Sequence, residues 1–146
     1  NLKVRQNQHL QRKLTPDFVI DWLYKKVQKQ INKVNEIGKN FNYFTPFESI
    51  FEKAEKAKQV ISLGTQFGEG WLISGEILSF ASQGVNHVIS LQPFGCIANH
   101  IVEKGIEKRI KSLCPQMNIL SLDFDSSVSD VNITNRLLLF IDNINN

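Results

Sequence analysis

Residues 92–96, Gln-Pro-Phe-Gly-Cys, place one of the two cysteines between an apolar run and the start of a helical pattern. The apolar run over 87–91 predicts a strand, and the spacing over 97–113 predicts an amphipathic helix. The free N–H groups and positive dipole end at a helix start favour the thiolate, which attacks electrophiles and binds metals. Cys96 is therefore a candidate metal ligand. A small apolar residue filling a crowded turn is the alternative, and the spacing leaves both interpretations open.

His100 and Cys114 are the other cysteine and histidine positions along this helix. His100 lies four residues after Cys96 on the same helix face, so a Cys/His pair can form there, and a capping or core histidine is the alternative. Cys114 stands at the far end of the helix, and we interpret it as a structural residue. A helix over 97–113 holds its ends about 25 Å apart, whereas bridged Cα atoms lie within about 7 Å, so we expect no disulfide between the two cysteines.

Two further motifs follow predicted strands. Residues 64–70, Gly-Thr-Gln-Phe-Gly-Glu-Gly, lack the lysine and the glycine spacing of phosphate or dinucleotide loops. This stretch either permits a tight crossover or cradles an anionic group with backbone amides. Asp123 and Asp125 could hold Mg²⁺ through water or form turns, and Arg136 is a potential partner for either carboxylate. The candidate ligand-binding residues are Gly68, Glu69, Gly70, Gln92, His100, Asp123, Asp125, Asn132 and Arg136, and Cys96 is the candidate metal ligand.

The elements that must position these motifs alternate between short apolar runs and helices. Strands are predicted over 60–63, 87–91 and 118–122, and helices follow each of them over 70–82, 97–113 and 129–143. Three such units predict parallel strands joined by right-handed crossovers. The expected fold class is α/β, a three-layer Rossmann- or flavodoxin-like domain with at least three parallel strands. The motifs then share the carboxyl edge of the sheet, where ligands bind in such folds.

The amino-terminal part has a different pattern. Thr15-Pro16-Asp17 is a helix start signal, and apolar residues at helical spacing predict an amphipathic helix over 16–37 that stops at Gly38. Thr45-Pro46 predicts the start of a shorter helix that ends near Lys58. We expect an amino-terminal helical arm over 1–44 that packs on an α/β domain over 45–146.

Length and charge narrow the classes of function. A chain of 146 residues with a hydrophobic fraction of 42% fits one core. Residues 1–58 hold twelve Lys or Arg against six Asp or Glu, and residues 59–146 hold five against eight. The lysines recur at helical spacing without clustered arginines or interleaved aromatics, so we expect a solvated helix face and no nucleic-acid partner.

The hydropathy and the cysteines of the chain indicate its cellular compartment. No apolar run approaches the roughly 20 residues of a membrane span, and no signal-peptide pattern opens the sequence, so we expect no membrane contact and a cytoplasmic location. Two cysteines without a signal peptide favour a reducing compartment. The first residue is Asn and not Met, and we expect a fragment of a longer protein.

Three stretches, QFGEGWLISGEI over 66–77, GVNHVISLQPFGCIANHIVEKGIEKRIKSLCP over 84–115 and NILSLDFDSSVSDVNITNR over 118–136, carry a resemblance to a known family. The chain resembles the carboxyl-terminal portion of the large proteins related to the ATP-dependent activators of 2-hydroxyacyl-CoA dehydratases. The resemblance covers about 66–140 specifically, 45–65 less clearly and 1–44 hardly at all.

This resemblance implies actin-like ATP-binding domains and iron–sulfur ligation upstream, joined to modules similar to the dehydratase subunits. In those subunits a cysteine at a comparable strand-to-helix turn helps to bind a 4Fe–4S cluster, and Cys96 is the position that fits. The chain departs from a complete member because it has neither an actin-like phosphate motif nor a cysteine pair, so we expect no ATP hydrolysis by this fragment alone. The parent would be the ATP-dependent dehydratase activator or reductase. A 4Fe–4S cluster generally needs four thiolates, so we expect a cluster in the parent protein only, and a brown preparation of this chain would contradict that expectation.

Three functions follow as hypotheses. The first is an accessory α/β module that supplies one thiolate and a strand-edge cleft to an iron–sulfur redox or acyl-CoA site completed by other domains of the parent chain or by a dehydratase-like subunit. The second is an interaction module without chemistry, in which the basic helix docks on a neighbouring domain. The third is a free-standing domain that binds CoA or a nucleotide through the amides of 64–70.

Overall fold

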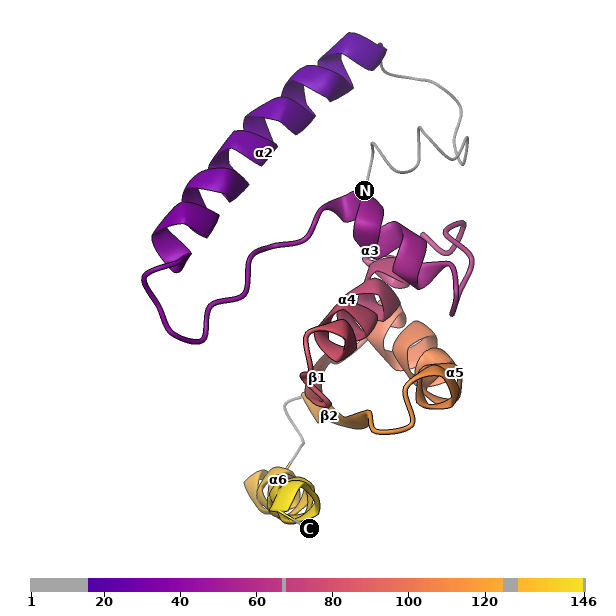
Figure 1. Ribbon diagram of the computed structural model, residues 1–146. Coiled ribbons are helices and arrows are strands. Elements are labelled where there is room, and N and C mark those ends of the chain that lie inside the picture. The colour runs from indigo at the N-terminus through magenta and orange to yellow at the C-terminus, as the bar shows by residue number, and fades with distance from the viewer. Residues whose placement is uncertain (1–15, 67, 125–128, 146) are drawn as a thin grey trace. The chain divides into compact units, whose positions relative to one another are not determined.

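The computed structural model describes residues 16–66, 68–124 and 129–145, and the helices and strands are labelled in Figure 1. The chain divides into two compact units, Asn1–Ala54 and Glu55–Asn146. Asp125 and Thr15, both named in the sequence predictions, lie outside the described residues. Within the described part of the chain, none of the helices combines the length and apolar character needed to cross a bilayer.

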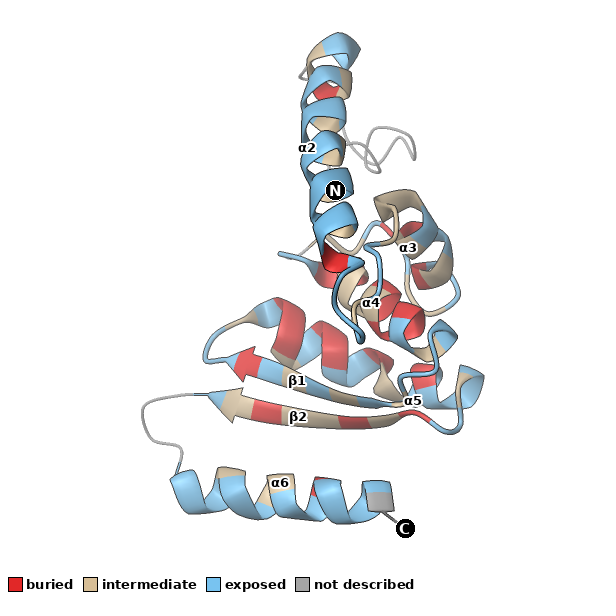
Figure 2. Ribbon diagram, turned by 60° about the vertical axis from the view of Figure 1, so that its left-hand side comes forward, coloured by how far each residue is buried: buried red, intermediate tan, exposed pale blue. Residues whose placement is uncertain are grey.

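The second unit contains a two-stranded parallel sheet formed by β1 (His87–Pro93) and β2 (Asn118–Phe124). Figure 2 shows the two strands side by side. The register runs from His87 opposite Asn118 to Pro93 opposite Phe124. The connection is helical, formed by a π-helical turn η1 (Ala98–Glu103) that continues into α5 (Lys104–Leu113). This is the strand–helix–strand unit that parallel neighbours require.

The predicted three-layer fold with at least three parallel strands is wrong, because the described residues contain one sheet of two strands. Residues 60–63, predicted as a strand, turn instead. The N–H groups of Val60 and Ile61 each donate to the carbonyl of Ala57 at 2.9 Å, and Thr65 N–H donates to the Ser62 carbonyl at 3.0 Å. Val60 and Ile61 are partly buried against the core. A short apolar run can enter a core from a turn as well as from a strand, and periodicity does not separate the two.

The helices on either side of these strands match their predicted positions closely. Helix α4 spans Gly70–Ser82, and α6 spans Asp130–Asn145. After α4, Val85 N–H donates to the Phe80 carbonyl at 2.9 Å and Gly84 N–H to the Ala81 carbonyl at 3.1 Å. This pair of bonds is a Schellman motif, which needs the positive φ that Gly84 adopts at 80°. The motif turns the chain directly into β1.

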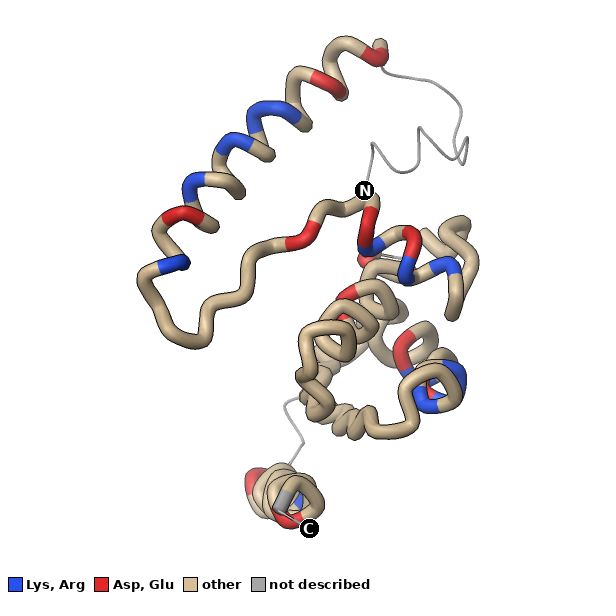
Figure 3. Tube along the Cα trace, in the orientation of Figure 1, with Lys and Arg blue, Asp and Glu red and all other residues tan. Residues whose placement is uncertain are grey.

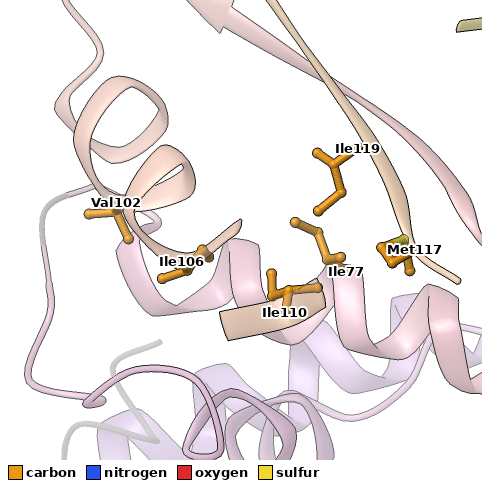
Figure 4. Close-up of a cluster of buried hydrophobic side chains, with 6 residues drawn as sticks. All are labelled: Ile77, Val102, Ile106, Ile110, Met117 and Ile119. Carbon is orange, nitrogen blue, oxygen red and sulfur yellow. The ribbon is translucent and has the colours of Figure 1, made fainter. Parts of the chain in front are cut away.

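The core of the second unit lies between α4, η1–α5 and the start of β2. Val102, Ile106 and Ile110 follow one another at a spacing of four residues and are all buried. They form one cluster with Ile77 of α4, Met117 and Ile119, and Figure 4 shows Ile77 next to Ile110, with Met117 and Ile119 beyond it. A helix and a two-stranded ribbon are each marginal alone, so their burial against one another is what stabilises this unit.

The first unit contains α2 (Asp17–Gly38) and the start of α3 (Ile50–Ala57). Tyr24 and Phe51 pack with ring centroids 5.7 Å apart. The helix predicted after Thr45-Pro46 begins later, because Ser49 and Glu52 form a capping box. Ser49 N–H donates to the Glu52 carboxylate at 2.9 Å, and Glu52 N–H donates to Ser49 Oγ at 3.2 Å.

Replacing Ile110 by Ala should lower the free energy of unfolding by about 3 kcal/mol, because a fully buried side chain is lost from the core. Ile101→Ala is the matched control on the same helical connection, since Ile101 is 66% exposed, and it should cost less than about 0.5 kcal/mol. Urea unfolding followed by Trp71 fluorescence in a Trp22→Phe background measures both. Equal losses in the two variants would contradict the position of the core.

Candidate functional site at the carboxyl edge of the strands

The candidate site lies where β1 and β2 end. Phe94 N–H donates to the Phe124 carbonyl at 2.9 Å, so the pairing of the strands continues to this edge. The chain then turns, with Cys96 N–H donating to the Pro93 carbonyl at 3.1 Å. Gly95 adopts a φ of 76° within this turn, a backbone conformation that side chains disfavour. The turn brings Cys96 directly to the start of the helical connection.

Cys96 is half-buried and stands immediately before the first helical residue. Its carbonyl accepts the backbone N–H of His100 at 2.9 Å and also lies 3.1 Å from His100 Nδ1. Because a carbonyl oxygen only accepts, the second contact requires a hydrogen on Nδ1. The Cys96–His100 contact therefore passes through the backbone carbonyl and not through the sulfur.

His100, Asp123 and Lys104 form a half-exposed polar group beside Cys96. With its hydrogen on Nδ1, His100 presents Nε2 to Asp123 Oδ1 at 3.5 Å, and the same oxygen lies 3.4 Å from Lys104 Nζ. The Nε2 contact becomes an ion pair only when the imidazole is protonated. Each of the three side chains is exposed enough for water to screen these contacts, so they contribute little to stability and remain accessible to a ligand.

A buried polar cluster lies beneath this edge and centres on Glu103. Its side-chain carboxyl accepts hydrogen bonds from Gln92 Nε2 on β1 and from Ser121 Oγ on β2, the latter at 2.9 Å. Gln92 Nε2 also lies 3.3 Å from the Asn99 carbonyl, and Asn99 Nδ2 donates to the Leu91 carbonyl at 2.9 Å. The cluster thus joins η1 to both strands. Glu103 is 1% exposed and Gln92 is fully buried.

Burial raises the pKa of the Glu103 carboxyl above its ordinary value, because desolvation penalises the charged form. The hydrogen bonds from Ser121 and Gln92 act in the opposite direction and are the smaller effects. Glu107 raises the pKa further, and Lys104 lowers it. Both hydrogen-bond donors to this carboxyl are neutral side chains.

The structure brings the three sequence motifs together only in part. A Cβ added to Gly68 would lie 3.6 Å from the Cβ of Ala98, so the 64–70 turn adjoins the start of η1. Two amides at the start of α4 are already used, since Trp71 N–H donates to the Thr65 carbonyl at 3.2 Å and Leu72 N–H to the Glu69 carbonyl at 2.7 Å. These amides are not available to cradle an anion.

The remaining candidates take different positions. Gln92 is fully buried within the Glu103 cluster and is not presented at the surface. Arg136 donates to the backbone carbonyl of Ser121, whereas Asp123 contacts His100 and Lys104. Asn132 is exposed on α6, and its N–H donates to the Ser129 carbonyl at 2.9 Å. Glu69 is exposed before α4, and Gly70 is buried at its start.

Cys96 is the residue that the sequence patterns predict as a metal ligand at this edge. Among the described residues, no three His, Cys, Asp or Glu side chains come together in a way that could hold a metal ion. Cys114 is half-buried and packs against the hydrophobic core.

Glu103, Asn99 and Ser121 belong to the site, and the sequence patterns did not predict them. The signal was weak, because the strand face that carries Gln92 and Ser121 holds Ser90 and Asp123 as well as the apolar Val88 and Ile119. Polar residues on a covered strand face indicate that the covering helix supplies a polar partner, but they do not indicate which residue that is.

No protein-family profile, curated protein or solved structure matches this chain.

Gly95→Ala should lower the free energy of unfolding by about 1 kcal/mol, because alanine disfavours the φ of 76° that the Cys96 turn requires. Gly105→Ala is the matched comparison, since Gly105 lies inside α5 with open space around its missing Cβ. It should raise the free energy of unfolding by about 0.5–1 kcal/mol. Urea denaturation of both variants measures the difference in sign, and a stabilising Gly95→Ala would contradict the turn.

Proposed function

We propose that this chain is an accessory α/β module of a protein similar to the 2-hydroxyacyl-CoA dehydratase activators. Its strand edge contributes the Cys96 thiolate to an iron–sulfur redox or acyl-CoA site that other domains or a dehydratase-like subunit complete. The parent protein, in its cytoplasmic setting, would supply the ATP-dependent activity.

The position of Cys96 supports this proposal. The residue follows β1, stands at the beginning of a helix and is partly accessible. His100 and Lys104 lie at the same edge and can assume positive charge near an anionic cluster or a CoA phosphate.

The observation that carries the proposal is the apolar rim around this edge. Phe94, in the turn after β1, is 80% exposed, and Ile97 and Ile101, on the helical segment after Cys96, are more than half exposed. Large apolar side chains gathered beside a polar edge mark a surface that another protein surface covers. A site shared with a covering domain would also receive its missing ligands from that domain, because one thiolate is not enough for a 4Fe–4S cluster.

Cys96→Ser in the intact parent protein, purified without oxygen, should remove most of the iron and sulfide, because one thiolate ligand is lost. Cys114→Ser is the control and should retain both, since Cys114 packs against the core. The measurement is iron and sulfide content per chain. Unchanged content in Cys96→Ser, with activity retained, would contradict the ligand role.

A second candidate function is an interaction module without chemistry, and it is favoured by the surface of α2. Leu23, Val27, Val34 and Ile37 are exposed along this helix. Four lysines follow one another along α2 and are among the blue positions of this helix in Figure 3: Lys25, Lys26, Lys29 and Lys33. Their helical spacing places them on the face of α2 next to these apolar residues. An apolar stripe beside a basic row suits an acidic surface with an apolar centre.

Val27→Asp separates this candidate from the first. Because Val27 is 57% exposed, the change should alter the stability of the present chain by less than about 0.5 kcal/mol. In the parent protein the same change should lower the melting temperature by several degrees if α2 is buried against a neighbouring domain. Thermal unfolding of both proteins provides the measurement, and equal, small effects in both would contradict docking through α2.

A further inference from the structure

The Glu103 cluster contains more buried acceptor atoms than donor groups. The acceptors are the two carboxyl oxygens of Glu103, the backbone carbonyls of Leu91 and Asn99, and Oε1 of Gln92, for which the described residues provide no hydrogen-bond partner. The donors are the side-chain amides of Gln92 and Asn99 and the hydroxyl of Ser121. A proton on the Glu103 carboxyl would add one donor to this set and remove a buried charge, whose desolvation outweighs the opposing effect of the hydrogen bonds from Ser121 and Gln92.

None of the hydrogen bonds described for the Glu103 carboxyl comes from a lysine, an arginine or a histidine. Lys104 bonds Asp123 at the strand edge, together with His100. On α5 the next carboxylate is Glu107, which pairs with Lys111 at 2.7 Å. Helix α4, which packs against η1, carries Glu76 as its one ionisable residue. From α6, Arg136 binds the Ser121 carbonyl.

Protonation of Glu103 affects how η1 is attached to the strands, because of where Glu103 lies. The residue ends the π-helical turn η1, and its carboxyl is bonded to one side chain from each strand. π-Helical turns are rare in proteins and are frequent at functional sites. These side-chain bonds attach η1 to both strands, alongside the burial of Val102 in the core.

We propose that Glu103 is a proton-dependent latch: a proton on its carboxyl strengthens the attachment of η1 to β1 and β2, and loss of that proton loosens this attachment. The latch concerns the fold of this chain and does not depend on the function proposed for Cys96.

The sign of the pH dependence follows from the raised pKa of Glu103 in the folded state. A carboxyl with a raised folded-state pKa binds its proton more tightly when folded than when unfolded. Its contribution is fully present below the ordinary value of 4.5 and is lost as the pH rises through the folded-state pKa. Across that window one proton changes the unfolding equilibrium constant by up to about tenfold per pH unit.

The experiment uses the whole chain and two isosteric variants, Glu103→Gln and Glu107→Gln. Urea unfolding from pH 4 upward should show that the wild-type chain loses stability as the pH rises and that Glu103→Gln does not. Hydrogen exchange of the backbone amides of residues 99–104, corrected for intrinsic rates, should show the same contrast locally. Glu107→Gln should keep a dependence of the same sign, moved to lower pH because the Glu107 charge that helps to raise the pKa of Glu103 is removed.

Three outcomes would overturn the latch. The first is a wild-type pH dependence that persists in Glu103→Gln. The second is failure of Glu103→Gln to fold, because the neutral isostere should be accepted. The third is a pH dependence of stability without any change in the protection of residues 99–104, which would place the responsible group elsewhere.

Discussion

The attachment of η1 to the two strands of the second unit centres on one buried carboxyl. Glu103 is almost completely removed from water, and a group of this kind is tolerated only where donors reach it or where it binds a proton. Gln92 and Ser121 provide these donors from two different strands. The turn that carries Glu103 must therefore lie over the carboxyl ends of β1 and β2. Loss of either donor would leave the carboxyl under-bonded, which is more costly than the bond itself is stabilising.

This constraint also positions the surface above it. Cys96 lies one turn of chain before the cluster, and His100 lies between Cys96 and Glu103 along the same helical segment. Fixing the far end of η1 therefore fixes the orientation from which His100 meets Asp123. This edge carries the partly accessible Cys96, the charged side chains of Lys104 and Asp123, and an exposed apolar rim. Such a combination suits a site that is finished by another surface, which is the basis of the proposed accessory role.

Local sequence patterns predicted a substantial part of this fold. Helix α4 and strand β1 were predictable from apolar runs between glycine turns, and β2 was predictable from the apolar run of residues 118–122 between two predicted helices. The third strand failed because a run as short as Val60–Leu63 carries no periodicity, and the Ala57 carbonyl holds it in a turn. Of the site, the Cys96 turn was predictable from Pro93 and Gly95. Glu103 was not, because a carboxylate on a helix is normally exposed and only tertiary contacts with two strands bury it.

The carboxyl carbon of Glu103, followed by ¹³C NMR through a pH titration of the intact chain, tests the central claim most directly. A carboxyl buried among neutral donors should titrate above 4.5, and its transition should be accompanied by shifts in the side-chain amide signals of Gln92. Titration at or below 4.5, with the Gln92 amide unaffected, would mean that Glu103 is solvated. The cluster that joins η1 to the two strands would then not exist in solution.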